Sequence, residues 1–409
     1  MSDKPPLPTG LALTPLDPVF RECPHKYLDL LRAEDPVHRD TILGRRFLTK
    51  ADDVRTVLAD RSFSVDPRKA PPGSYQRSLA IGDGPPEAFT PSMLHLDDPE
   101  HKRIRDLVSQ AFNQRSIDAY RPRISAIAEE LLDGLSGRES FDLVAEFASP
   151  FPIIVIAGML GVDARDMAQF KRWTDALSQA FNPARTDDET AQFRAAQMDI
   201  ASYFIRAAKA RRQKRGNDLV SALVWAEESG TTLSETDIAI TCNLLLSAGN
   251  LTMTDLIGNG VLTLLNHPAE LAKFRADPDR APKIVEEILR YDSPVAQTAR
   301  IALQPRVIGG MQIEAGESVT ASFLAAGHDP ARHADPHRFD IERADTTHYA
   351  FGGGAHYCLG APLARAEAQI GLSLLFARFP QLRLDPEHAI VHKKVPVFNG
   401  LQALWVRPS

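Results

Sequence analysis

The sequence has few cysteines and little net charge. Its 409 residues include three cysteines, Cys23, Cys242 and Cys358, which lie far apart and form no Cys-x-x-Cys pair. This pattern excludes a disulfide framework and fits a reducing compartment, so we expect a cytoplasmic protein. The net charge of -6 and the isoelectric point of about 6.1 give no reason to expect binding to nucleic acid or to an anionic membrane.

A long apolar run is also missing near the N-terminal end. The first eight residues read Met-Ser-Asp-Lys-Pro-Pro-Leu-Pro, whereas a signal peptide or a membrane anchor would need a continuous apolar segment. No internal repeat or low-complexity linker marks a boundary between domains. We therefore expect one domain over residues 1–409, in which residues 1–12 form a loose, proline-rich arm.

Helical periodicity dominates the chain between Asp98 and Tyr291. Before this region, the pattern predicts a hairpin over Pro36–Leu48 and a long loop over Ser64–Leu96, where glycine, proline and serine are frequent. Loops of this length inside a compact domain are usually functional. The predicted helices are Pro24–Arg32, Ala51–Ala59, Glu100–Phe112, Ile117–Leu135, Pro152–Leu160, Ala164–Phe181, Asp188–Arg215, Asp218–Glu227, Ser234–Asn266, Pro268–Ala276 and Ala281–Tyr291.

Short strands and one more helix are predicted after this region. The strands are Ala299–Leu303, Gln312–Ile313 and Ser318–Phe323. An irregular stretch over Asp329–Tyr349 then leads to a helix that runs from Pro362 to Phe379, and two short strands close the chain. The predicted fold class is therefore mainly α with small β-sheets.

Cys358 stands at the end of a glycine-rich loop, directly before this last helix. The loop reads Phe351-Gly-Gly-Gly-Ala-His-Tyr-Cys358-Leu-Gly360. The N–H groups and the dipole of a helix N-terminus favour a thiolate, and glycines let the backbone approach a flat ligand closely. These residues favour a thiolate that binds iron, as in one class of haem proteins. The alternative is a buried structural cysteine in a turn.

The loop resembles the haem-binding loop of cytochromes P450. That loop reads Phe-x-x-Gly-x-His/Arg-x-Cys-x-Gly, and every fixed position is present here. Other similar stretches cover most of the chain. The resemblance implies the cytochrome P450 fold and haem b (iron protoporphyrin IX), with Cys358 as the iron ligand and Phe351, Gly352 and Gly360 beside it. It also implies a monooxygenase of the soluble bacterial type.

The middle of the longest predicted helix carries a second part of the resemblance. It reads Ala248-Gly249-Asn-Leu-Thr252-Met, where the distal helix of cytochromes P450 has Ala/Gly-Gly-x-Asp/Glu-Thr-Thr/Ser. The match implies that Ala248 and Gly249 leave room for O2. The Thr252 hydroxyl can bond back to the Ala248 carbonyl and open the helix. All three residues are therefore candidates for the catalytic centre.

Leu251 departs from this pattern because it replaces the usual acid, and Met253 replaces the second hydroxyl residue. Leucine cannot carry a proton, so the protons that O2 activation requires need another route. We expect a displaced relay through Asp255, which lies four residues past Leu251 on the same helix face. Asn250 or Thr254, a polar group of the substrate, or the use of peroxide are the alternatives. Leucine is also the better helix former, which offers a purely structural reason.

Glu287 and Arg290 lie three residues apart on the predicted helix Ala281–Tyr291, where they can pair. The segment resembles the P450 helix whose buried Glu–Arg pair holds the loop before the cysteine. A second arginine from that loop should join the pair, and we expect Arg343, with Arg338 as the alternative. Such a buried pair positions the chain and takes no part in the chemistry.

Further residues match positions that hold the haem propionates in the family. His101 and Arg105 lie four apart on one helical face, Arg300 lies in a predicted strand, and His356 lies in the cysteine loop. Cationic and N–H donors that converge on carboxylates form charge-assisted hydrogen bonds.

His328, His333 and His337 raise the question of a metal site. They lie close together in the sequence, with two aspartates between them. However, their spacing matches no regular zinc pattern, and two intervening prolines prevent a common helical face. An ordinary loop that leads toward the haem is therefore the favoured interpretation.

The resemblance finally implies the substrate and the partners. An apolar organic substrate, small or of medium size, should contact the Ser64–Leu96 loop, the catalytic residues of the long helix, and Leu245, Val295, Ala296, Val397 and Phe398. No residues remain for a fused electron-transfer domain, so a separate ferredoxin and an NAD(P)H-driven ferredoxin reductase should supply electrons to a monomer. A peroxide-using haem-thiolate enzyme and a non-catalytic haem sensor are the alternatives.

Overall fold

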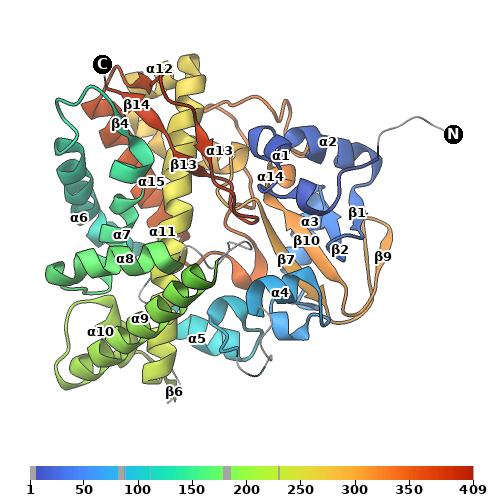
Figure 1. Cartoon of the computed structure of the whole chain (residues 1–409), viewed down its shortest axis with the longest axis horizontal. Coiled ribbons are helices and arrows are strands. Elements are labelled where there is room, and N and C mark those ends of the chain that lie inside the picture. The colour runs from blue at the N-terminus through green and yellow to red at the C-terminus, as the bar shows by residue number, and fades with distance from the viewer. Residues whose placement is uncertain are drawn as a thin grey trace. The chain divides into compact units, whose positions relative to one another are not determined.

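Helices form most of the protein, and short strands pair into small sheets. The computed structural model describes residues 6–81, 87, 89–110, 112–177, 186–228 and 231–408. The chain divides into two compact units (Figure 1). Unit 1 comprises residues 1–91, 286–358 and 392–399, and unit 2 comprises residues 92–285, 359–391 and 400–409. No helix among the described residues is both long and apolar enough to cross a membrane.

Unit 1 is built around a five-stranded sheet with the strand order β1-β2-β10-β7-β3. Strand β10 runs parallel to β2 and antiparallel to β7. The strands are β1 (Val37–Asp40), β2 (Arg45–Leu48), β3 (Phe63–Ser64), β7 (Gln297–Ala302) and β10 (Ser318–Ser322), and a hairpin adds β8 (Arg306–Ile308) and β9 (Met311–Ile313). The helices are α1 (Pro18–Glu22), α2 (His25–Glu34), α3 (Ala51–Ala59), α4 (Tyr75–Ile81) and α14 (Phe323–Gly327).

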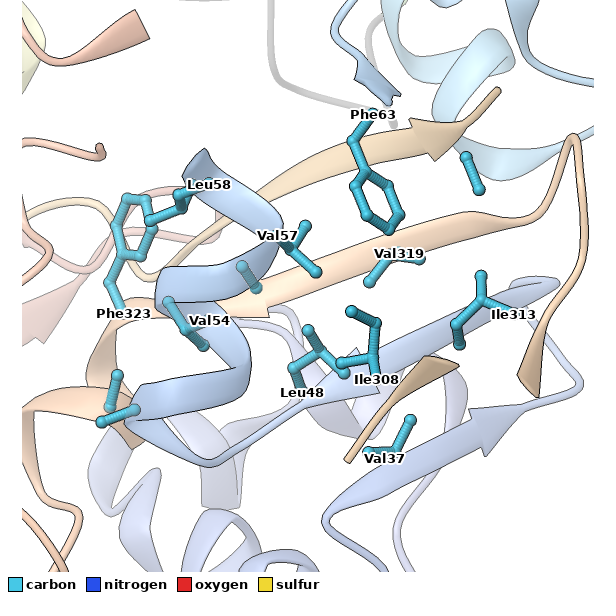
Figure 2. Close-up of a cluster of buried hydrophobic side chains, with 14 residues drawn as sticks. Val37, Leu48, Val54, Val57, Leu58, Phe63, Ile308, Ile313, Val319 and Phe323 are labelled. Atoms are coloured by element: carbon cyan, nitrogen blue, oxygen red, sulfur yellow. The ribbon is translucent and has the colours of Figure 1, made fainter. Parts of the chain in front are cut away.

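The apolar face of α3 packs on this sheet. Val54, Val57 and Leu58 recur at helical spacing, and all three are buried. Figure 2 shows them beside Val319 of β10 and Ile308 of β8 in one cluster of buried side chains. Because α3 is fixed in this way, its C-terminal end provides a firm support for any loop that contacts it.

Unit 2 is mainly helical and surrounds the long helix α11 (Glu235–Asn266), which contacts α7, α9 and α15 (Figure 1). Ser234 begins α11 with a capping box: the Asp237 N–H donates to Ser234 Oγ at 3.0 Å, and the Ser234 N–H donates back to Asp237 Oδ2 at 3.1 Å. The other helices are α5 (Glu100–Ser109), α6 (Gln114–Asp133), α7 (Pro150–Met159), α8 (Met167–Leu177), α9 (Asp187–Gln213), α10 (Leu219–Trp225), α12 (Pro268–Ala276) and α15 (Ala361–Arg378).

Short strands complete the chain. A three-stranded sheet has the order β11-β14-β4, with β4 (Phe141–Asp142), β11 (Arg383–Leu384) and β14 (Trp405–Arg407). The remaining strands are β5 (Glu227–Glu228), β6 (Thr231–Thr232), β12 (Val391–His392) and β13 (Leu401–Ala403). Helix α13 (Ala281–Tyr291) passes from unit 2 into unit 1.

The mainly helical fold class is confirmed, and α3, α12 and α13 have the predicted limits. The prediction of a long loop over Ser64–Leu96 was wrong in part, because the described residues of this segment include α4 and turns of 3-10 helix at Pro67–Lys69 and Met93–His95. Phe323 begins α14 and does not end a strand, since Ser322 caps that helix with a hydrogen bond from the Ala325 N–H. Four short strands, not two, follow α15.

Two further predictions need qualification. The expected loose arm over residues 1–12 is held from Thr9 onward, because the Thr9 hydroxyl and the Gly10 N–H both donate to Asp40 Oδ1. Residues 1–5 lie outside the described part of the chain. The helix predicted over Ala164–Phe181 appears as α8 and ends at Leu177 in the described residues. Its last predicted residues, 178–181, lie outside them.

Candidate functional site

The loop before Cys358 is closed on itself and supported by α3. The Cys358 N–H donates to the Phe351 carbonyl at 2.8 Å. Gly352 and Gly354 have φ values of 71° and 63°, in the left-handed region that favours glycine. A Cβ atom at Gly354 would overlap the carbonyl oxygen of Leu58 at the end of α3. The loop therefore needs glycine for its own turn and for its close approach to α3.

Cys358 differs from the other two cysteines in its surroundings. It is half-buried, and α15 begins three residues later, with Gly360 as its N-cap and Pro362 in its first turn. Cys242 is fully buried on α11, and burial raises the pKa of its thiol far above the usual range. Cys23 is exposed in the short connection between α1 and α2. Only Cys358 combines partial exposure with a glycine loop and a following helix, which is the setting of a thiolate ligand.

The middle of α11 presents an accessible stretch in a helix that is otherwise largely buried. Ala248 is exposed, and Gly249, Leu251 and Thr252 are half-buried. The Thr252 hydroxyl donates to the Ala248 carbonyl at 2.8 Å, as expected from the sequence. A Cβ atom at Gly249 would have no described side-chain atom closer than 3.9 Å, from Ile156. The exposure of Ala248 therefore makes this stretch of α11 accessible, as the binding of a ligand beside it requires.

Asp255 lies on the same face of α11 as Ala248 and Thr252, one turn further along. It is almost completely buried, and its carboxylate packs closely against Gly400, where a Cβ atom would overlap it. Asn250 and Thr254 are also buried, and the Thr254 hydroxyl donates to the Asn250 carbonyl at 2.9 Å. Among the three residues considered for a proton relay, Asp255 alone is acidic and shares the Thr252 face.

The predicted propionate-binding residues are divided between the units. In unit 2, His101 is buried on α5, and its Nδ1 lies 3.3 Å from Asp98 Oδ1. Burial lowers the pKa of His101, and Asp98 partly offsets this effect. Arg105 follows one turn later on α5. In unit 1, the guanidinium of Arg300 donates to the Ala299 carbonyl at 2.8 Å and to Thr298 Oγ1 at 3.1 Å.

His356 is the fourth of these predicted anchors. It is half-buried and belongs to a turn of 3-10 helix over Gly354–His356, inside the cysteine loop of unit 1.

Four of the predicted substrate residues lie together in unit 1. Val295 and Phe398 form an isolated antiparallel bridge, and the Ala296 N–H donates to the Val397 carbonyl at 2.9 Å. The two segments, far apart in the sequence, are thus joined directly. Leu245, the fifth residue, is buried on α11 in unit 2, almost one turn before Ala248.

Glu287 and Arg290 form a buried ion pair in unit 1. Arg290 Nε and Nη2 donate to the two carboxylate oxygens of Glu287 at 2.7 and 2.8 Å, and both side chains are fully buried. Arg343 Nε donates to Glu287 Oε1 at 3.2 Å. Arg338 contributes only its backbone carbonyl, while its largely exposed guanidinium lies 3.7 Å from Asp340. Of the two arginines considered, Arg343 is therefore the one that joins the pair.

Glu367 and Asp292 are two carboxyl groups with a raised pKa that the sequence analysis did not single out. Glu367 of α15 is buried, its Oε2 has no hydrogen-bond partner among the described residues, and burial raises the pKa of the carboxyl well above 4.5. Glu367 lies four residues after Leu363 and four before Gly371, so all three share the buried face of α15. This helical spacing was the signal that the sequence offered. Burial raises the pKa of Asp292 to about 6, although Asn399 Nδ2 donates to it at 2.6 Å. Only the tertiary structure reveals that pair.

The chain is similar to known proteins in sequence and in structure. The family model described as Cytochrome P450 matches residues 46–396. Cytochrome P450 107B1 of Saccharopolyspora erythraea is 38% identical over 406 residues, which cover 97% of this chain and 98% of the relative. Cytochrome P450 monooxygenase PikC of Streptomyces venezuelae is 38% identical over 410 residues, covering 98% and 94%. The crystal structure of P450BioI in complex with hexadec-9Z-enoic acid ligated acyl carrier protein has a TM-score of 0.86 and 33% identity, covering 95% of this chain and 98% of that one.

Proposed function

Because this chain belongs to the cytochrome P450 family, we propose that it inserts one oxygen atom from O2 into an apolar organic substrate of small or medium size. The family and its relatives make the chain an oxidoreductase of the monooxygenase class with the cytochrome P450 fold. Our proposal concerns the type of substrate and the electron donor. The lack of any cysteine pair in the sequence supports a cytoplasmic location for this activity.

The observation that carries the proposal is the setting of Cys358. Its glycine loop is closed by the hydrogen bond to Phe351 and fixed on Leu58, so the thiol has a defined position before α15. We assign Cys358 as the thiolate ligand of haem b, with Phe351, Gly352 and Gly360 around it. Haem held by a cysteine thiolate supplies the electron density that favours cleavage of the O–O bond.

The remaining residues of the site receive roles as binding groups. His101, Arg105, Arg300 and His356 would hold the haem propionates by charge-assisted hydrogen bonds. The accessible face of α11 at Ala248 and Gly249 would leave room for O2. An apolar substrate is supported by the apolar side chains of Leu245, Val295, Ala296, Val397 and Phe398, and by the fatty acyl group that P450BioI accepts.

The electron source decides between this function and its alternatives. We expect NADH-driven product formation by the monomer to require both a ferredoxin and its reductase, and to stop when either is omitted. Product formed with hydrogen peroxide alone, and none with the electron-transfer pair, would instead select a peroxide-using enzyme. Ligand binding without product under either condition would select a non-catalytic haem sensor. A spectral screen of apolar compounds for loss of iron-bound water identifies the substrate to be used.

We predict that Asp255 replaces the missing acid at position 251 as the proton donor for Thr252. Asp255→Asn should lower the product formed per NADH several-fold and raise hydrogen peroxide release, because a positioned acid contributes strongly to proton transfer. Wild-type protein should itself release some peroxide, since Leu251 interrupts the usual route. Thr252→Ala should have the same effect as Asp255→Asn. Product, NADH and peroxide are measured in the same reaction.

A structural role of Asp255 beside Gly400 would give a different result. Thermal unfolding of each variant separates the two roles, because a relay variant keeps the wild-type midpoint. Thr254→Val serves as the control: it removes a buried hydroxyl on another face of α11 and should leave the ratio of product to NADH unchanged. The relay is contradicted if the wild-type enzyme forms one product per NADH consumed and Asp255→Asn leaves that ratio unchanged.

A further inference from the structure

Three histidines from separate segments meet in unit 1. His25 is the first residue of α2, His328 follows α14, and His337 lies in the loop beyond it. Their ring centroids lie 3.7 Å apart for His25 and His328, and 5.1 Å apart for each of the other two pairs. One ring nitrogen from each lies within 4.8 Å of one from each of the others. We call these residues the three-histidine cluster.

The cluster differs from the group of histidines that stands out in the sequence. His333 is not part of it, because its Nε2 lies 3.0 Å from the Thr347 carbonyl, and its place is taken by His25. The two prolines that prevent a common helical face for His328 and His337 therefore do not keep these rings apart. Both residues contact His25 at the start of α2.

The hydrogen bonds of the cluster are those that orient metal-binding histidines. A ligating histidine usually donates its second ring N–H to a backbone carbonyl or to a carboxylate. His328 Nδ1 lies 3.2 Å from the Leu324 carbonyl, and His337 Nε2 lies 2.9 Å from Asp29 Oδ2. Since a carbonyl and a carboxylate only accept, these nitrogens carry the protons. In the neutral form of each ring, the lone pair is then on Nε2 of His328 and on Nδ1 of His337.

His25 contributes a buried nitrogen. Its Nδ1 is inaccessible to solvent and has no hydrogen-bond partner among the described residues. Burial, together with the charges of His337, Arg32 and Arg290, lowers the pKa of His25 to about 3. Burial likewise lowers the pKa of His328 well below 6.5.

The charges around the cluster are already partly compensated. Arg32 donates to Asp29 Oδ1 at 2.6 Å and to the Ala325 carbonyl at 2.7 Å, and Arg290 is paired with Glu287. Asp29 thus joins Arg32 to His337 and supplies the negative charge closest to that ring. An open groove of about 520 Å³, lined by Asp29, Arg32, Pro336 and His337 among others, gives solvent access to the exposed side of His337.

We propose that the three-histidine cluster binds one divalent transition-metal ion, with zinc as the expected metal. Three imidazoles are a common zinc ligand set, with Zn–N distances of about 2.0–2.1 Å, and water completes the coordination. One ring nitrogen of each histidine lies close enough to the others to share one centre, and His337, the most exposed of the three, lines the groove. Asp29 acts as a positioning residue that orients His337 and does not bind the ion itself.

Such an ion would connect α2 to the segment that Arg290 holds. Arg290 Nη1 donates to the carbonyl of Gly327, which precedes His328, at 2.7 Å, and to that of Pro336, which precedes His337, at 2.9 Å. The metal ion would hold the side chains of His328 and His337, and the Arg290 guanidinium holds the carbonyls of the residues directly before them. Both groups would thus fix the chain at the same two points. We infer a structural role in unit 1, which is independent of the proposed monooxygenase reaction.

Zinc binding to the full-length, haem-loaded protein without an affinity tag tests the proposal. After treatment with a chelator, calorimetric titration with Zn²⁺ should show one saturable site per chain, and binding should raise the midpoint of thermal unfolding. His337→Gln, at an exposed position, and His25→Gln should each abolish this site. Asp29→Asn should weaken zinc binding by about 10–100-fold, the usual effect of losing a group that orients a ligand.

His388→Gln is the matched control. His388 also lies next to a carboxylate, with Nδ1 3.2 Å from Asp385 Oδ2, but it does not belong to the cluster, so zinc binding should be unchanged. The proposal is overturned if the wild-type protein binds no equivalent of zinc, or if both cluster variants bind it as tightly as wild type does. Circular dichroism of each variant verifies that it is folded.

Discussion

Replacing Cys358 with alanine should abolish the red-shifted Soret band that carbon monoxide gives with reduced, thiolate-ligated haem, and with it all monooxygenase turnover. The other two cysteines cannot substitute, because Cys242 is fully buried on α11 and Cys23 is exposed in the α1–α2 connection. Cys358→His should also lose the band while it retains haem, since imidazole binds iron without the same electron donation. Difference spectra and haem content are the measurements.

Arg300→Ala is the control for this prediction. Arg300 is proposed to contact a propionate and not the iron, so the variant should keep the thiolate band. It should only release haem faster to apomyoglobin, because one charge-assisted hydrogen bond is worth about 1.5–3 kcal/mol. A Cys358→Ala protein that retained the band would refute the assignment of Cys358 as the ligand.

Local sequence patterns were sufficient for elements that bury a regular face. The apolar spacing of Val54, Val57 and Leu58 gave α3 its correct limits, since those side chains pack on the sheet as the pattern requires (Figure 2). Helix α4 was missed because its seven residues are too few to be stable alone. The pairing of β4 with β14 joins residues more than 260 positions apart, and two-residue strands carry no periodicity of their own.

The same distinction applies to the functional residues. The Ala248–Thr252 hydrogen bond and the Glu287–Arg290 pair connect residues within one helix, so the spacing allowed them and the family resemblance was enough to predict them. Arg343 was chosen from a loop by resemblance, and the structure shows its contact with Glu287. The three-histidine cluster could not be predicted, because His25 lies about 300 residues before its two neighbours and only the folding of unit 1 brings it there.

Removing Arg290 should destabilise the protein strongly. Its guanidinium makes five hydrogen bonds, to both oxygens of Glu287 and to the carbonyls of Gly327, Pro336 and Arg338. Arg290→Ala leaves the Glu287 carboxylate buried with Arg343 as its remaining cation, and breaking such a pair costs about 3–5 kcal/mol. We expect a thermal midpoint lower by several degrees and faster proteolysis within residues 327–343. Both are measured on purified protein.

Conservative variants show that geometry as well as charge is required. Arg290→Lys should recover only part of the loss, because an ammonium group cannot donate to both oxygens of Glu287 and to three carbonyls at once. Arg338→Ala is the matched control: its guanidinium is largely exposed and 3.7 Å from Asp340, so its loss should cost no more than about 1 kcal/mol. Equal midpoints for Arg290→Ala and Arg338→Ala would show that the buried pair does not hold this segment. A protease-resistant segment in Arg290→Ala would lead to the same conclusion, because the carbonyls of Gly327 and Pro336 would then need no guanidinium to stay in place.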